Sequence, residues 1–279
     1  MMIIIARILK ENKYINKFIR LISPIFMRIF GFEVEDEVFI FLFSFLSGNP
    51  TSHILINDLY KEERISKAEA NRLSVSLCFS SFLYLYKSSI LFFKESIWII
   101  ILISYLIPLI FLIKPQRNYS STKHISPSNK RLDLSQIIND SFNSLIRIFS
   151  FVFFFDIIAS LLIQFFKLDN SHSFILSSLL DMTVSNRFYY SYSKSLDLFL
   201  YSFFNAFLGF SIHLQIINAT GFLDYKEFLL KRLIIALISG LTATLLYYNI
   251  IIGLICFILL IGLIIIIKKE NTAKVISKC

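Results

Sequence analysis

The sequence predicts an all-α polytopic membrane protein, and its composition and two long apolar runs are the observations that predict it. Of the 279 residues, 56% are hydrophobic and only 17% are charged, whereas soluble domains contain about 45–50% apolar and about 25% charged residues. Residues 233–267 contain no charge, and residues 198–223 contain no Asp, Glu, Lys or Arg. Each run exceeds the roughly 20 apolar residues that cross a bilayer. A soluble enzyme, a disordered tail and a disulfide scaffold are therefore excluded.

The net charge of +9 and the spacing of the cysteines narrow the possible partners. Positive charge is typical of the cytoplasmic loops of membrane proteins, so we expect a lipid bilayer around the chain and no nucleic acid partner. Cys78, Cys256 and Cys279 have neither a zinc spacing nor a disulfide pattern. The chain also lacks a His-x-x-x-His pair, a Gly-x-Ser-x-Gly motif and clustered carboxylates. We therefore expect no catalytic residue, no metal site and no cofactor.

The first membrane half, residues 1–113, opens with an interfacial N-terminal segment. Residues 1–9 are apolar, and the basic residues that follow them do not fit a signal peptide. Phe18–Phe32 mixes apolar and basic residues. We expect an interfacial helix here, broken at Ser23–Pro24, because proline lacks the amide that a helix interior needs.

The next feature is a short apolar piece that stops at Gly48, Asn49 and Pro50. Residues 38–47 are too few to span a bilayer. Glycine and proline end helices, so we expect a half-helix here that resumes over Thr51–Tyr60.

The rest of the first half is predicted to contain a capped helix and a full span. Ser66 and Glu69 have the spacing of a capping box, which predicts a helix over Ala70–Tyr86. Ser96–Ile113 is apolar throughout and is predicted to span the membrane with a tolerated kink at Pro108.

Two basic segments set the expected topology. Residues 114–136 contain five Lys or Arg against one Asp and form a solvated linker between the halves. Residues 268–279 form a basic tail. Both are expected to face the cytoplasm, so the second half, residues 137–267, must cross the membrane an even number of times.

The second half supplies four apolar segments for these crossings. Phe174–Asn186 is too short to be one of them and is expected to be re-entrant. Asp224 is expected to cap the third crossing, and Asn249 to separate the third from the fourth. The expected crossings are Phe142–Phe166, Leu196–Thr220 with an interruption at Gly209, Phe228–Tyr248, and Ile250–Ile267.

The two halves share a pattern of interruption. Ser66 follows Pro50 by sixteen residues, and Asp224 follows Gly209 by fifteen. Each cap precedes a helix that contains Arg-Leu. Paired interrupted segments indicate a transporter site. The alternative is that glycine and proline permit only close packing or kinks, as they do in many membrane helices.

Three stretches of the chain match a known family in order and spacing. They are Gly48-Asn49-Pro50-Thr51-Ser52 followed by Ile65–Lys67 and Glu69–Leu73; Leu180-Asp181-Met182-Thr183; and Gly209–Gln215 followed by Tyr225–Leu233. With these residues the chain resembles the sporulation integral membrane protein family of the YlbJ type, which is related to the nucleoside-recognition gate domain. The similarity covers nearly all of residues 20–250.

The chain departs from the family in several places. Ser52 stands where the family has a second glycine, Asp181 replaces a glutamate, and Leu77–Phe79 replaces a Cys-Asn-Asn-like step. The family also has further membrane helices before the position of residue 20. The chain is therefore expected to be an N-terminally shortened and divergent member.

The resemblance implies two gate-like halves with discontinuous or re-entrant helices. It also implies a role in endospore formation, with dipicolinic acid, a small anionic solute, transported across the outer forespore membrane. A homo-oligomer or other sporulation membrane proteins are possible partners. The alternative is a non-transporting membrane scaffold, or a degenerate family member, that spore formation needs.

An anionic solute needs hydrogen-bond donors and the positive ends of half-helices. His213 offers a donor and proton coupling if charged; the alternative is a neutral core histidine bonded to a carbonyl. We also expect Gly48–Ser52 and Gly209–Gln215 to face each other near the midplane. The expected substrate-binding residues are Gly48, Asn49, Pro50, Ser52, Ser185, Asn186, Gly209, His213 and Gln215.

Three charged residues in apolar surroundings are given other roles. Asp156 is expected to be either a protonated packing residue or a relay, without a direct partner in its own helix. Arg72 and Arg232 lie near helix starts and are expected to snorkel to head groups or to pair with Glu69 and Glu227.

Overall fold

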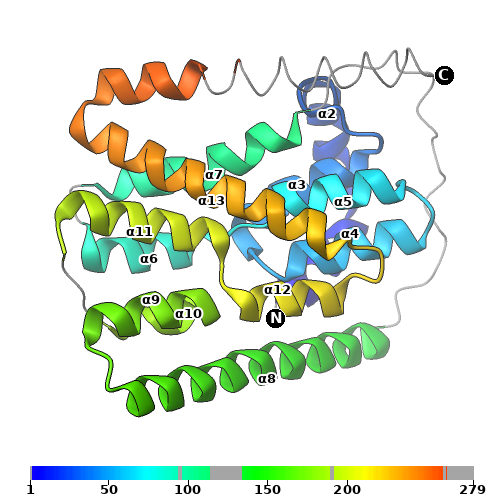
Figure 1. The fold of residues 1–279 in the computed structure, drawn as a ribbon. Helices are drawn as coiled ribbons and strands as arrows, with labels where there is room; N and C mark the ends of the chain where they lie inside the picture. The colour runs from blue at the N-terminus through cyan, green and yellow to red at the C-terminus, as the bar shows by residue number, and fades with distance from the viewer. Residues whose placement is uncertain (1, 94–95, 114–133, 189–191, 260–261, 263–279) are drawn as a thin grey trace.

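The computed structural model describes residues 2–93, 96–113, 134–188, 192–259 and 262, and in these ranges the chain forms helices and no strand (Figure 1). The predicted all-α fold is thus confirmed. Most of the basic linker, residues 114–133, and the whole tail, residues 268–279, lie outside the described residues.

Short helices dominate the first part of the chain, and the longest helices follow the linker. In chain order the helices are α1 (Met2–Glu11), α2 (Lys13–Phe30), α3 (Glu35–Ser47), α4 (Thr51–Lys61), α5 (Lys67–Ser76), α6 (Phe82–Phe92), α7 (Ile97–Leu112), α8 (Leu134–Phe166), α9 (Asn170–Leu180), α10 (Met182–Ser185), α11 (Lys194–Phe207), α12 (Phe210–Ala219) and α13 (Tyr225–Tyr248).

Three helical stretches are long and apolar enough to cross a membrane: Ile137–Phe166, Lys194–Ala219 and Tyr225–Tyr248. They coincide with three of the four crossings predicted for the second half. The second stretch includes the interruption at Gly209. The fourth predicted crossing is described only as the short helix 250–259, which follows a hinge at Asn249.

Helix α7 is shorter than the predicted full span. It has 16 residues, which extend about 24 Å at about 1.5 Å per residue. Pro108 lies inside it, as expected for a tolerated kink.

The break predicted at Ser23–Pro24 is absent, because α2 runs through Pro24 without interruption. Proline removes one amide and so leaves one carbonyl, that of Arg20, without its helical donor. Arg20 is exposed, so surrounding solvent or lipid head groups can satisfy that carbonyl. The hydroxyl of Ser23 donates to the Ile19 carbonyl at 2.7 Å and stays within the helix.

The continuous helix predicted over Ala70–Tyr86 is wrong. Ser66 caps α5 as expected, since its hydroxyl accepts from the Glu69 amide at 3.1 Å. However, α5 ends at Ser76, and α6 begins only at Phe82. Side chains from neighbouring helices satisfy the carbonyls that this break frees, as described below, and the Ser81 hydroxyl caps the start of α6.

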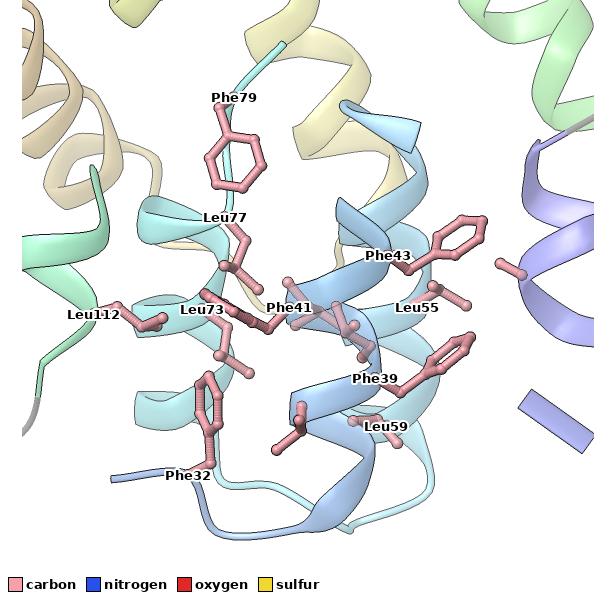
Figure 2. Close-up of a cluster of buried hydrophobic side chains, with 14 of the residues drawn as sticks. Phe32, Phe39, Phe41, Phe43, Leu55, Leu59, Leu73, Leu77, Phe79 and Leu112 are labelled. Atoms are coloured by element: carbon pink, nitrogen blue, oxygen red, sulfur yellow. The ribbon is translucent and has the colours of Figure 1, made fainter. Parts of the chain in front are cut away.

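Two groups of buried apolar residues hold the helices together. The first gathers side chains from α3, α4 and α5, with Phe41, Leu73 and Leu77 near its middle (Figure 2). The second joins α7, α11, α12 and α13 and contains Tyr201 and Phe228. In Figure 1, α11 and α13 lie side by side, and they contact each other extensively.

Helix α7 contributes to both groups from opposite faces. Ile97, Ile101 and Tyr105 pack in the first group, whereas Ile103 and Ile107 pack in the second. The sequence boundary at the linker is therefore not the boundary between the two cores.

The cap of α13 provides a measure of local stability. The Asp224 carboxylate accepts from the amides of Lys226 at 3.1 Å and Glu227 at 3.2 Å, so the predicted cap is confirmed. We expect Asp224→Ala to destabilise the protein by about 1 kcal/mol, because such caps contribute about 0.5–2 kcal/mol. Thermal unfolding in detergent measures this, and Asp224→Asn is the control that keeps a capping oxygen. Equal loss in both variants would contradict a capping role.

Candidate solute site at the helix breaks

Gly48 holds the first break in a conformation that favours glycine. Its φ of 63° and ψ of −161° lie in a region that is essentially closed to other residues. A Cβ at this position would lie 2.5 Å from the backbone nitrogen of Ser81. The predicted break between α3 and α4 is thus present, and it packs directly against the unpredicted break between α5 and α6.

Gly209 repeats this arrangement in the second half. Its φ of 81° and ψ of 158° are close to those of Gly48. A Cβ here would lie 3.0 Å from the Ser178 carbonyl oxygen and 3.1 Å from the Cα of Asp181. Asp181 separates α9 from α10, so each glycine break crosses another helix break.

The freed carbonyls between α5 and α6 accept hydrogen bonds from the polar side chains around Gly48. The Asn49 amide donates to the Phe79 carbonyl at 3.2 Å, and the Ser52 hydroxyl donates to the Leu77 carbonyl at 3.4 Å. Buried carbonyls need such partners. Both side chains therefore have a structural role, whereas the Asn49 Oδ1 has no hydrogen-bond partner among the described residues.

Two buried histidines cap carbonyls in the same way. Nε2 of His53 lies 2.9 Å from the Ser74 carbonyl, and Nε2 of His213 lies 2.8 Å from the Phe207 carbonyl. A carbonyl can only accept, so Nε2 carries the proton in each ring. The Nδ1 atoms lie near the hydroxyls of Ser52, at 3.3 Å, and Tyr225, at 3.5 Å. The His213 ring is thus satisfied as a neutral imidazole, whereas the single hydrogen of the Ser52 hydroxyl serves either His53 Nδ1 or the Leu77 carbonyl.

Arg232 is the most unusual residue of this region. Its side chain is fully buried, at 0% exposed, and its Nη1 donates to the Val75 carbonyl at 3.3 Å. Its Nε and Nη2 have no partner among the residues that the structure describes. Arg232 interacts electrostatically with His53, His213 and Cys78, so it lies where the broken helices of the two halves meet.

The predicted roles of the two helix-start arginines are therefore half right. Arg72 pairs with Glu69 as expected and also donates to the Leu112 carbonyl. Arg232 neither snorkels nor pairs with Glu227, which binds Lys231 instead. Arg232 is the eighth residue of α13, and it lies on the helix face that packs inside the protein rather than at the surface.

The unpaired guanidinium edge of Arg232 gives a second stability prediction. We expect Arg232→Met to raise the free energy of unfolding of the unliganded protein by about 1–2 kcal/mol. Replacing buried charge by apolar groups of similar volume is often stabilising, and the loss of one donor to Val75 offsets part of the gain.

Thermal unfolding of the purified protein in detergent checks this expectation. Lys231→Met, at an exposed neighbouring position of the same helix, is the control and should change stability little. A loss of more than about 1 kcal/mol in Arg232→Met would show that the guanidinium is fully satisfied in the folded chain.

The residues predicted around 185 lie at a different crossing. The Asn186 amide donates to the Tyr84 hydroxyl at 3.0 Å, and that hydroxyl donates to the Met182 carbonyl at 3.0 Å. The Ser185 hydroxyl also donates to the Met182 carbonyl, at 2.8 Å. These contacts tie α10 to α6 and use the polar atoms for backbone capping, whereas no residue in the described part of the chain bonds the Asn186 Oδ1.

Gln215 and Pro50 lie together, but on another side of the breaks. They line a small pocket of about 50 Å³ between α4, α8 and α12, together with Arg147 and Asn218. The amide of Gln215 donates to the Ser211 hydroxyl at 3.3 Å. Pro50 of the first glycine segment and Gln215 of the second thus line one pocket, whereas a shared ligand and a position near the midplane stay predictions.

Asp156 has a partner that its own helix does not provide. Its carboxylate pairs with Arg187 at 2.9 Å. The expectation that Asp156 has no direct partner in its own helix is therefore confirmed, because the chain after α10 brings the cation to α8; its role as a packing residue or a relay stays a prediction.

The sequence reasoning missed His53 and Arg232, although one signal for Arg232 was present. Arg232 shares a helical face with Ala236, Ser239, Gly240 and Ala243, all of which are buried. Small residues on one face of a membrane helix indicate a close helix contact. An arginine in line with them is therefore expected inside the bundle.

Comparisons of the whole chain with protein-family models, with curated proteins and with solved structures give no match. The geometry of the breaks and the resemblance described above are therefore the observations that bear on function.

Proposed function

We propose that this chain is a multi-pass membrane protein that carries a small anionic solute across the cell membrane. The observation that carries the proposal is the buried guanidinium of Arg232, which has two unpaired donors where broken helices cross. Paired discontinuous helices are typical of transporter sites. A buried cation without a carboxylate partner favours an anionic ligand.

The surface of α8 supports the membrane part of the proposal. Only 11% of its most apolar stretch is buried, and Phe149, Phe153 and Phe165 are 66%, 67% and 80% exposed. In Figure 1, α8 lies along one edge of the helix bundle. An exposed apolar surface of this length is an aggregation hazard in water and a suitable lipid contact in a bilayer.

The resemblance narrows the solute to dipicolinic acid and the location to the outer forespore membrane. Dipicolinate carries carboxylates, which match an arginine donor. In this proposal α8, α11–α12, α13 and the predicted fourth crossing Ile250–Ile267 span the membrane, and the α9–α10 pair is re-entrant. The two gate-like halves meet where α4 contacts α12.

A second function, a non-transporting scaffold, is favoured by a specific observation. The donors of Asn49, Ser52 and His213 are already used by backbone carbonyls. In a scaffold these bonds would keep the breaks closed, and Arg232 would only compensate the negative end of α5, a favourable arrangement at a helix C-terminus.

Uptake by proteoliposomes decides between these functions. The full chain is reconstituted, and entry of labelled dipicolinate is measured against empty liposomes and against the Arg232→Met variant. Transport predicts uptake by the wild type alone. Equal retention in all three preparations, with a protein that is correctly inserted, would reject transport and favour the scaffold.

Complementation gives an independent measure of the cellular role. A sporulating strain that lacks dipicolinate transport is supplied with this chain, and the dipicolinate content of its spores is measured. Restored content is expected. Unchanged content, together with active proteoliposomes, would reject the sporulation role and leave anion transport standing.

A further inference from the structure

We infer that the Nε and Nη2 edge of Arg232 binds one carboxylate group of the solute. This inference deepens the proposed function, on which it rests, by naming the residue that recognises the ligand and the chemical group it recognises. Arg232 was not among the residues that the sequence assigned to a site.

The guanidinium of Arg232 has the geometry to bind a carboxylate. Nη1 is held by the Val75 carbonyl at 3.3 Å. The two unpaired nitrogens, Nε and Nη2, form one edge of the planar group, and their N–H bonds point in the same direction. Such an edge matches the two oxygens of a carboxylate in a bidentate pair.

The unpaired edge lies inside the protein, beside the break between α5 and α6. Arg232 is fully buried, so water at the surface does not reach it. Its carbonyl partner belongs to the last turn of α5, where the helix is interrupted by the break at Leu77–Ser81. Asn49, whose Oδ1 is also unpaired, hydrogen-bonds in this region with Phe79 and interacts with Cys78.

The described neighbours of Arg232 do not compensate its positive charge. His53 and His213, which interact electrostatically with Arg232, each donate from Nε2 to a backbone carbonyl. Cys78 is a fully buried free thiol. The described residues place no carboxylate against Arg232, so the site has one positive charge to balance.

One positive charge favours a carboxylate over a phosphate. A carboxylate brings a single negative charge, whereas phosphate near neutral pH brings more than one and would leave excess charge buried. A dicarboxylate would therefore bind Arg232 through one of its two groups.

Binding measurements on the full chain in lipid nanodiscs test this inference. The probes are benzoate, which presents one carboxylate on a flat ring, and benzamide, which has nearly the same shape and no charge. Inorganic phosphate is the third probe. We expect benzoate to bind the wild type at least about tenfold more tightly than either benzamide or phosphate, as a charged bidentate pair requires.

The key variant is Arg232→Lys, which keeps the charge and loses the two-pronged edge. We expect it to weaken benzoate binding about 10- to 100-fold. Arg20→Lys is the matched control, because the Arg20 side chain is exposed and pairs with Glu35. This variant should bind benzoate as the wild type does. If the lysine variant fails to fold, Arg232→Met replaces it.

Several results would overturn the inference. Benzamide or phosphate binding as tightly as benzoate would reject a carboxylate site, and so would a wild type that binds no benzoate. Unchanged benzoate affinity in both Arg232 variants would place the anion elsewhere. These failures are distinguishable from a failure of transport: benzoate binding that depends on Arg232, without any dipicolinate uptake, would support the site and reject the transporter.

Discussion

Replacing Gly48 by alanine is expected to lower the free energy of unfolding by about 3–5 kcal/mol. The residue sits at a φ of 63° and ψ of −161°, where a side chain costs about 1–3 kcal/mol in backbone strain. The new methyl group would also lie 2.5 Å from the Ser81 nitrogen. That atom belongs to a neighbouring backbone, and overpacking of this kind costs about 1–3 kcal/mol more.

Two further glycines provide a comparison and a control for this prediction. Gly209→Ala should show a smaller loss, because its nearest atom, the Ser178 carbonyl oxygen, is 3.0 Å away. Gly221→Ala is the control: nothing lies within 4 Å of the added carbon, and we expect a change of at most about 0.5 kcal/mol. Thermal unfolding in detergent ranks the three. If Gly48→Ala and Gly221→Ala melt together, the close crossing of the two breaks is wrong.

Replacing Phe153 in the middle of α8 by lysine is expected to raise the free energy of membrane insertion by about 2.5–3.5 kcal/mol, which is the cost of a charge at a helix centre. Phe153 is 67% exposed and lies near the middle of the Ile137–Phe166 stretch. At an exposed site in water the same change would cost at most about 0.5 kcal/mol. The prediction therefore separates a lipid-facing α8 from a water-facing one.

An insertion assay with glycosylation sites on both sides of α8 measures this effect. The inserted fraction should fall strongly in Phe153→Lys and stay unchanged in the control, Phe153→Leu, which remains apolar. Equal insertion of the two variants would reject α8 as a membrane-crossing helix.

The sequence was informative where single residues control the backbone. Gly48, Gly209 and Asn249 interrupt helices as predicted, and the caps at Ser66 and Asp224 are present. Each of these effects acts within a few residues. A local pattern is therefore enough to predict them.

The break between α5 and α6 could not be predicted in the same way. Residues 77–81 contain neither glycine nor proline. Their helix is interrupted because Asn49, Ser52 and Tyr105 supply donors to the freed carbonyls from elsewhere in the fold. The opposite error occurred at Pro24. The proline predicted a helix break, but α2, a surface helix, continues through it.

The candidate site followed the same rule. Gly48, Asn49, Ser52 and His213 were predicted, and they do lie at or beside the breaks. The carbonyl bond of His213 was one of its two predicted alternatives, whereas the bonds of Asn49 and Ser52 were not predicted, because the carbonyls that they satisfy belong to the unforeseen break. The burial of Arg232 depends on α13 packing against α5, two helices far apart in the sequence.

The position of α7 between the two cores has a consequence for folding. One of its faces packs through Tyr105 with Phe45 and Phe79 in the first core, and the other packs with Tyr201 in the second. Either half of the chain made alone would leave an apolar face without its partner. The halves should consequently unfold in a single cooperative transition, and two separately expressed pieces should become stable only when they are produced together.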